Sequence, residues 1–128
     1  MNSSAPQHPT RHAPLAMDAE QFRALGHALV DEIASQLASI PCGPVTRDRS
    51  PSAVRAALGL NSALPAEGTD AATLLATTTT QLFEHSLFNG HPRFFGYITS
   101  SPAPIGILGD FLASALNPNV GAWMLSPA

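Results

Sequence analysis

The amino-acid sequence predicts a mainly α-helical chain with one short extended segment. Three observations support this fold class. Apolar residues recur at helical spacing in four segments, twelve Pro and nine Gly divide the chain into short elements, and 45% of the 128 residues are hydrophobic against 12% charged. Because strands alternate every second residue and these segments do not, helices are the expected elements. The low charge also argues against a wholly disordered chain.

The first expected helix begins at Asp18, a suitable N-cap residue. Gln21 stands three residues later, which is the spacing of a capping box. Pro41 ends the pattern because proline cannot donate the backbone hydrogen bond that a helix interior needs. The apolar residues of this helix share one face: Phe22, Leu25, Leu29, Ile33, Leu37 and Ile40.

A second, shorter helix is expected to begin at Ser50. Pro51 would occupy its first helical position, and Gly59 would end it. The segment before the first helix, residues 1–16, is rich in Pro, Ser, His and Gln and shows no periodicity. We therefore expect a disordered lead-in there.

A third helix is expected to begin at Thr69 or Asp70 and to end at the Asn89–Gly90 pair. Its weak point is the run from Thr77 to Thr80, because β-branched residues lose rotamer freedom in a helix.

Residues 94–99 then form the expected extended segment, which is too short to be a sheet by itself. Ser101-Pro102-Ala103-Pro104 then leads into a fourth, strongly apolar helix that ends at Asn117-Pro118. Its apolar residues are Ile105, Leu108, Phe111, Leu112, Ala115 and Leu116.

All six basic residues are Arg, and the chain contains no Lys. A chain without Lys cannot form a Schiff base through a side-chain amine or build a phosphate-binding loop of the GxxxxGK[ST] kind. The net charge of −3 and the scattered arginines give no basic patch for a nucleic acid.

Other classes of site and location are also disfavoured. No segment reads as a signal peptide or is long enough to span a membrane. The single cysteine, Cys42, excludes an internal disulfide and fits a cytoplasmic location. The five histidines lack ligand spacing, so no metal site is expected.

The most specific pattern of the chain lies in residues 91–128. It consists of His91-Pro92-Arg93-Phe94-Phe95, Asp110-Phe111-Leu112, Asn117-Pro118-Asn119, and Trp123 ahead of Ser126-Pro127-Ala128. Together with the upstream helices, this pattern resembles the group II pyridoxal-phosphate-dependent decarboxylases. That family includes aromatic amino acid, tyrosine, histidine and glutamate-type decarboxylases. The resemblance covers about residues 20–128.

The resemblance implies the N-terminal helical arm and the start of a large fold-type I domain. Residues 1–16 would be the lead-in, residues 17–90 a dimerisation arm, and residues 91–128 the truncated entry into the large domain. The complete enzyme would be a homodimer that uses pyridoxal 5′-phosphate to decarboxylate an aromatic or related amino acid. The family residues that bind the cofactor and act in catalysis match nothing here, so this chain alone is expected to be inactive.

The resemblance also implies that six residues border the substrate of the neighbouring subunit: Tyr97, Ile98, Thr99, Ser100, Gly121 and Trp123. The glutamate-type members carry an amide side chain where Tyr97 stands, so Tyr97 favours an aromatic substrate. Ile98 departs from the aromatic residue that is common at its position, which leaves the identity of the substrate open.

Plainer interpretations of the same residues stay open. Tyr97 could be a half-buried core residue, Trp123 could serve packing, and Thr99 and Ser100 could cap the next helix. The whole chain could also be a stand-alone helical interaction module, pairing through the face from Ile105 to Leu116 without catalysis. The behaviour of the purified chain distinguishes the enzyme fragment from the stand-alone module. A fragment with uncovered apolar surface is expected to aggregate, whereas a module should be soluble and unfold cooperatively.

Overall fold

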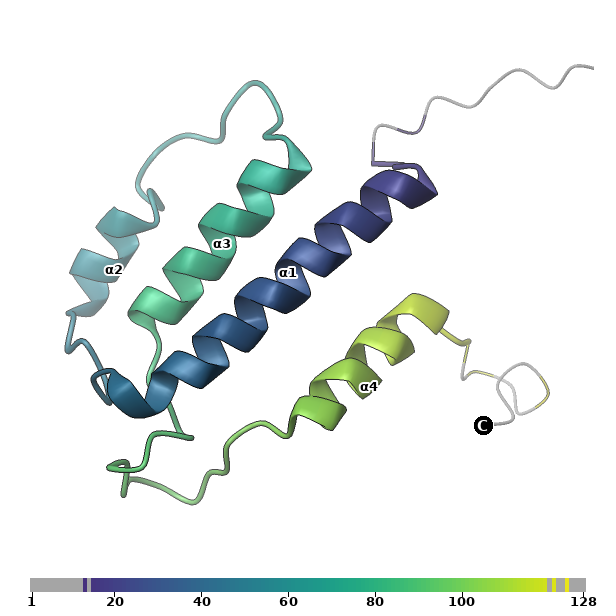
Figure 1. Cartoon of the computed structure of the whole chain (residues 1–128). Helices are drawn as coiled ribbons and strands as arrows, with labels where there is room; N and C mark the ends of the chain where they lie inside the picture. The colour runs from purple at the N-terminus through teal and green to yellow at the C-terminus, as the bar shows by residue number, and fades with distance from the viewer. Residues whose placement is uncertain (1–12, 14, 120, 122–123, 125–128) are drawn as a thin grey trace, which may run out of the picture.

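The computed structural model describes residues 13, 15–119, 121 and 124 of the chain. Within these residues the elements are α1 (Ala19–Ser39), the short 3₁₀ helix η1 (Ile40–Cys42), α2 (Pro51–Ala57), α3 (Ala71–His85) and α4 (Pro104–Leu116). Figure 1 shows helices joined by loops and no strand in the described part. The mainly α-helical fold class is therefore confirmed. The expected disordered lead-in lies mostly outside the described residues.

The start and end of α1 agree with the sequence pattern. The backbone N–H of Gln21 donates to Asp18 Oδ1 at 2.8 Å, and the backbone N–H of Asp18 donates to Gln21 Oε1 at 3.2 Å. This reciprocal capping box satisfies two N–H groups that the helix itself leaves unpaired. At the other end Pro41 lies within η1, where the chain tightens and leaves the helix.

The second helix also follows the prediction. Ser50 accepts a hydrogen bond at Oγ from the N–H of Ala53 at 3.2 Å, and Pro51 takes the first helical position. Gly59 follows the helix with φ +65, a left-handed conformation that glycine adopts without a Cβ penalty.

The third helix begins at its expected cap, where Asp70 Oδ1 accepts from the N–H of Thr73 at 3.0 Å. The threonine run from Thr77 to Thr80 is helical throughout. Thr79 is buried at 7% exposure and faces the α1–α3 hollow described below. Packing against a neighbouring helix therefore overrides the weak intrinsic helix preference of these residues.

The expected end of this helix at Asn89–Gly90 is wrong. The helix ends at His85, and the next residue is extended with φ −99 and ψ 157. The backbone N–H of Phe88 donates to the carbonyl of Val45 at 3.2 Å, and its ring stacks on that of Phe83 with centroids 6.0 Å apart. The bond to the distant Val45 and the stacking back onto Phe83 of α3 accompany the early end of the helix.

The segment 94–99 is not an extended strand. Tyr97 has φ +57, a left-handed conformation, and the backbone bends at residues 97 and 98. A strand is stable only beside a partner that completes its hydrogen bonds, and no other strand exists among the described residues.

The main packing between helices joins α1 and α3, which lie side by side (Figure 1). The fourth helix approaches α1 through Phe111, whose ring stacks on that of Phe22 with centroids 6.4 Å apart. No described helix is long and apolar enough to cross a bilayer.

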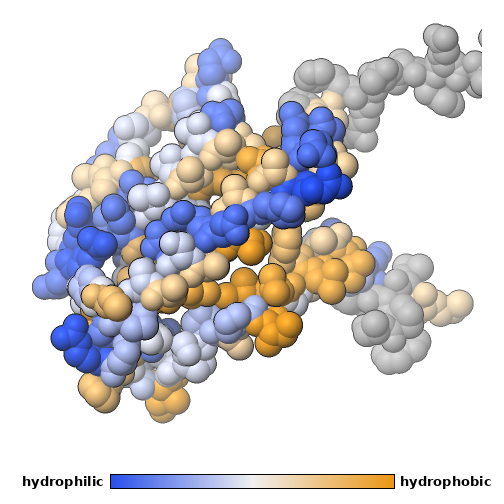
Figure 2. All heavy atoms as spheres, in the orientation of Figure 1, coloured by the Kyte–Doolittle hydropathy of each residue, from blue (hydrophilic) through white to orange (hydrophobic). Residues whose placement is uncertain are grey.

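The described residues contain no buried apolar side chain. Only two of them, Thr79 and His91, are buried. Figure 2 shows apolar side chains gathered on the surface of α4. The exposed large apolar residues of α4 are Ile105, Leu108, Phe111, Leu112 and Leu116. Secondary structure thus forms here without a closed hydrophobic core.

The Asp70 cap should make the helix content of the chain depend on pH. Hydrogen bonds from the side chain and backbone of Thr73 hold the pKa of the Asp70 carboxyl below its usual value. Because the pKa is lowered in the folded state, the stabilisation is present above the unfolded pKa and is lost as pH falls through the folded pKa. Asp70→Ala is therefore expected to reduce helix content at neutral pH, measured by far-ultraviolet circular dichroism.

Glu67→Ala is the matched control, because Glu67 is an exposed carboxylate of the preceding loop and caps no helix. The difference in helix content between D70A and E67A should shrink in strong acid, because the Asp70 carboxyl is then protonated and its capping advantage is lost. Equal helix content of D70A and E67A at neutral pH would contradict a capping role for Asp70.

Candidate functional site

Tyr97 lies in the loop between α3 and α4, whose two ends approach each other closely. A Cβ added to Gly90 would lie 2.9 Å from Cβ of Ser101. The side chain of Tyr97 is 85% exposed. Its left-handed backbone is a strained conformation for a residue with a Cβ, of order 1–3 kcal/mol. Such strain is typical of functional sites, and the exposure shows that Tyr97 is not the half-buried core residue of the plainer interpretation.

The shape of this loop depends on Gly96. A Cβ at this position would lie 3.0 Å from Cζ of Phe94, so a larger residue would crowd the Phe94 ring where it folds back over the backbone. The Phe94 ring in turn lies beside that of Tyr97, with centroids 6.5 Å apart. The phenol is therefore held on one side by an aromatic neighbour, and its remaining surface faces outward.

The three residues after Tyr97 are also exposed. Ile98 is fully exposed at 104%, and Thr99 and Ser100 are exposed as well. The N-cap of α4 is Ala103, with no side-chain cap, so neither hydroxyl caps that helix. The four residues together offer an aromatic ring, an aliphatic side chain and three hydroxyls. Such a surface can contact an apolar ligand and orient it by hydrogen bonds, but it contains no strong base.

Of the other two expected site residues, the structure describes only Gly121. Gly121 follows α4, where its N–H donates to Asn119 Oδ1 at 2.9 Å. The thirteen residues of α4 have an axial length of about 20 Å and separate Gly121 from Tyr97 along the chain. Trp123 lies outside the described residues. The structure therefore groups four of the six residues and leaves Gly121 apart.

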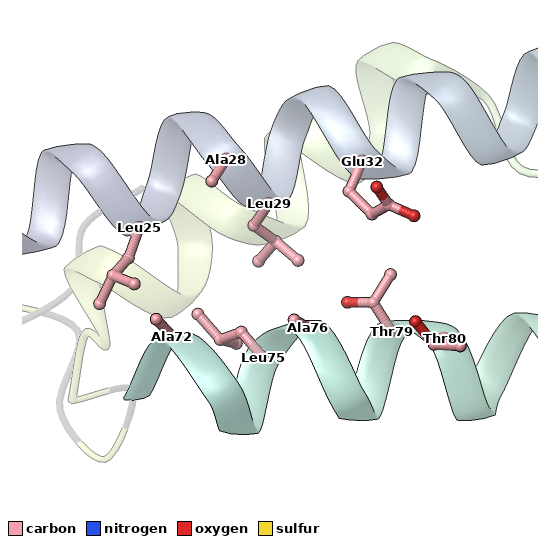
Figure 3. A pocket seen from close by; sticks show the side chains of 9 residues that line it. All are labelled: Leu25, Ala28, Leu29, Glu32, Ala72, Leu75, Ala76, Thr79 and Thr80. Carbon is pink, nitrogen blue, oxygen red and sulfur yellow. The ribbon is translucent and has the colours of Figure 1, made fainter. Parts of the chain in front are cut away.

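A hollow of about 360 Å³ lies between α1 and α3. In Figure 3 the side chains of Leu29 and Leu75 extend into the space between the two helices, with Glu32 and Thr79 further along it. The lining residues are Leu25, Ala28, Leu29, Glu32, Ala72, Leu75, Ala76, Thr79 and Thr80. Sequence reasoning missed this hollow. The signal was the set of small residues on facing helices, which leaves space where larger side chains would fill it.

A second hollow of about 310 Å³ lies where α4 meets α1 and α3. It is lined by Met17, Phe22, Leu25, Gly26, Leu29, Ala71, Leu74, Leu75 and Phe111. None of these side chains carries a charge or a strong hydrogen-bonding group. The hollow therefore offers apolar contact and nothing that would orient a polar substrate.

The residues of this chain do not fit the cofactor that the resemblance implies. Pyridoxal phosphate is held by a lysine Schiff base and by donors to its phosphate, and the chain contains no Lys. The only charged side chain that lines the α1–α3 hollow is the acidic Glu32, which would repel a phosphate, and the second hollow is apolar. No group of three His, Cys, Asp or Glu residues that could hold a metal ion occurs in the described part of the chain.

No family model matches the chain. Individual proteins do. The chain is 30% identical over 112 residues to tyrosine decarboxylase 4 of Petroselinum crispum, which covers 88% of this chain and 22% of the relative. It is 28% identical over 110 residues to the aromatic-L-amino-acid decarboxylase of Bacillus atrophaeus, covering 86% of this chain and 22% of that protein. Phenylacetaldehyde synthase of Petunia hybrida is 30% identical over 112 residues, which are 88% of this chain and 22% of that protein. The chain thus spans about a fifth of the length of these relatives.

Gly96→Ala is expected to move the Phe94 ring away from Tyr97, because the added Cβ would crowd that ring. The chain has a single Tyr, so nuclear Overhauser contacts between the Tyr97 and Phe94 rings report the change directly. These contacts should weaken severalfold in G96A.

Gly68→Ala is the control, since a Cβ at Gly68 meets nothing within 4 Å. If the ring contacts survive in G96A as they do in G68A, the proposed dependence of the loop on Gly96 is wrong.

Proposed function

Because this chain is homologous to part of the aromatic amino acid decarboxylases, we propose that it forms the N-terminal arm of a pyridoxal-phosphate-dependent carboxy-lyase. The similarity extends over 86–88% of the chain at 28–30% identity, and it confirms the resemblance seen in the sequence. This similarity is the observation that carries the proposal. Relatives that are enzymes by name do not favour a stand-alone interaction module.

In this proposal, residues 17–90 serve as the dimerisation arm and residues 91–128 enter the large domain. The exposed apolar side chains of α1, α3 and α4 support an arm that is covered by other polypeptide surface. Residues 1–16 would be a lead-in that takes no part in the site. The complete enzyme would act as a homodimer, and the single cysteine suits the reducing cytoplasm.

We further propose that the loop at residues 97–100 forms one wall of the substrate pocket of the partner subunit. The exposure and strained backbone of Tyr97 support this role. An aromatic ring favours an aromatic substrate side chain, while the hydroxyls of Tyr97, Thr99 and Ser100 would orient it. Gly121 and Trp123 would contribute from beyond α4. The relatives' names include tyrosine and aromatic amino acids, which agrees with this substrate class.

Residues elsewhere in the complete enzyme would hold the cofactor, which would supply an electron sink for the decarboxylation. The part of this chain in the reaction would be to shape the pocket, to exclude water and to bind the substrate side chain. We therefore expect the 128-residue chain alone to release no carbon dioxide from amino acids.

The coding sequence beyond the Ala128 codon tests the proposal first. We expect it to continue, in the same or a shifted frame, into a domain of several hundred residues that contains a lysine for the cofactor. The protein expressed from that frame should release carbon dioxide from tyrosine or tryptophan in preference to glutamate. Analysis of the product as amine or aldehyde is included, since one relative is an aldehyde synthase by name. Absence of such a continuation would refute the proposal.

Tyr97→Phe tests the pocket wall within that full-length protein. Loss of one hydrogen bond to the substrate should lower kcat/KM for the preferred aromatic amino acid by about tenfold. Steady-state release of carbon dioxide measures it.

Leu64→Ala provides the matched control, because Leu64 is 94% exposed and lies in the loop between α2 and α3. It should leave kcat/KM unchanged. Equal kcat/KM for Y97F and L64A would contradict a hydrogen bond from the Tyr97 hydroxyl to the substrate.

A further inference from the structure

His91 is the most buried residue of the described part of the chain, at 3% exposure. Both ring nitrogens are engaged. Nε2 lies 3.0 Å from the carbonyl oxygen of Gly43, 48 residues earlier in the sequence, and Nδ1 accepts from the backbone N–H of Arg93 at 3.0 Å. The backbone of His91 is used as well: its N–H donates to Phe88 and its carbonyl accepts from Phe94. All four polar groups of His91 therefore have partners.

These partners fix the protonation state of the ring. A backbone N–H can only donate, so Nδ1 must present a lone pair to Arg93. A carbonyl oxygen can only accept, so Nε2 must carry the hydrogen that faces Gly43. Only the neutral Nε2–H tautomer makes both bonds. Protonation would place a second N–H donor at Nδ1, 3.0 Å from the donor of Arg93, and would break that bond.

The charged and titratable groups around His91 provide no compensation. Arg93 belongs to the same turn, and Arg47 and Glu84 line the hollow that contains Gly43 and Phe88. Asp48, Arg49 and His85 line the adjoining hollow. In the described part of the chain no carboxylate forms an ion pair with His91. The imidazolium form would therefore lose a hydrogen bond without gaining a charged partner.

We propose that His91 is a pH-sensitive clamp between the turn at Gly43 and the turn at residues 88–94. In the neutral form it ties the two turns together, and in the protonated form it releases them. The clamped turn leads directly into Phe94 and Tyr97, so His91 is a positioning residue for the Tyr97 loop. Its consequence for substrate binding rests on the proposed function, whereas the clamp itself does not.

Hydrogen–deuterium exchange of the full 128-residue chain, read by mass spectrometry, tests the clamp whether or not the chain associates. After correction for intrinsic rates, protection of residues 88–94 should fall by about tenfold between about pH 8 and pH 5. A peptide from the middle of α1 should keep its protection and serves as the internal reference. An equal loss in both peptides would contradict the clamp.

Two variants show which histidine causes the pH-dependent protection of residues 88–94. His91→Gln keeps a neutral donor and acceptor, so its protection of residues 88–94 should no longer depend on pH. His85→Gln removes the nearby second histidine, whose Nε2 lies 3.1 Å from Gln81 Oε1, and should leave the pH dependence intact.

Persistence of the full pH dependence in H91Q would overturn the proposal. Its disappearance in H85Q would do the same, because the effect would then belong to His85. If H91Q lacks protection at both pH values, the pH dependence in H85Q decides the assignment: its persistence supports the clamp and its loss overturns it. The experiment involves no decarboxylation, so its failure would leave the proposed function standing, and failure of that function would leave the clamp standing.

Discussion

The uncovered apolar surface of α1, α3 and α4 is the constraint on which the rest of the structure depends. Burial of apolar surface is the main favourable term in folding, and no apolar side chain in the described part of this chain is buried. The helices are instead specified locally, by side-chain caps at Asp18, Ser50 and Asp70 and by turns at proline and glycine. Local hydrogen bonds define where each helix begins, but they do not supply the stability of a closed core. The proposed enzyme would supply other polypeptide surface to cover these helices.

One cross-connection holds the loops in place despite this open arrangement. The turn at residues 43–45 is joined to the turn at residues 88–94 by two hydrogen bonds, from His91 to Gly43 and from Phe88 to Val45. The loop that carries Tyr97 begins at this connection. Its strained, exposed tyrosine is thus held by contacts on one side only, and its other side is available for a ligand or a partner. The proposed pocket wall needs this combination of a fixed base and a free face.

The sequence pattern predicted the features that depend on neighbours in the chain. The starts of α1, α2 and α4 and the end of α4 at Asn117 follow from caps, prolines and apolar spacing. The features it missed depend on distant contacts. The bond between Phe88 and Val45 accompanies the early end of α3, and the hollow between α1 and α3 follows from how two helices pair. The positive φ of Tyr97 had no local signal, because asparagine or glycine would be the usual residue there.

Sedimentation velocity of the purified 128-residue chain over a range of concentrations tests the central claim most directly. Uncovered apolar faces predict self-association that grows with concentration and broad, weakly cooperative thermal unfolding of the same samples. A monomer at every concentration that unfolds in one sharp transition would show that the chain closes its own core. That result would contradict the account of an arm that requires a covering surface.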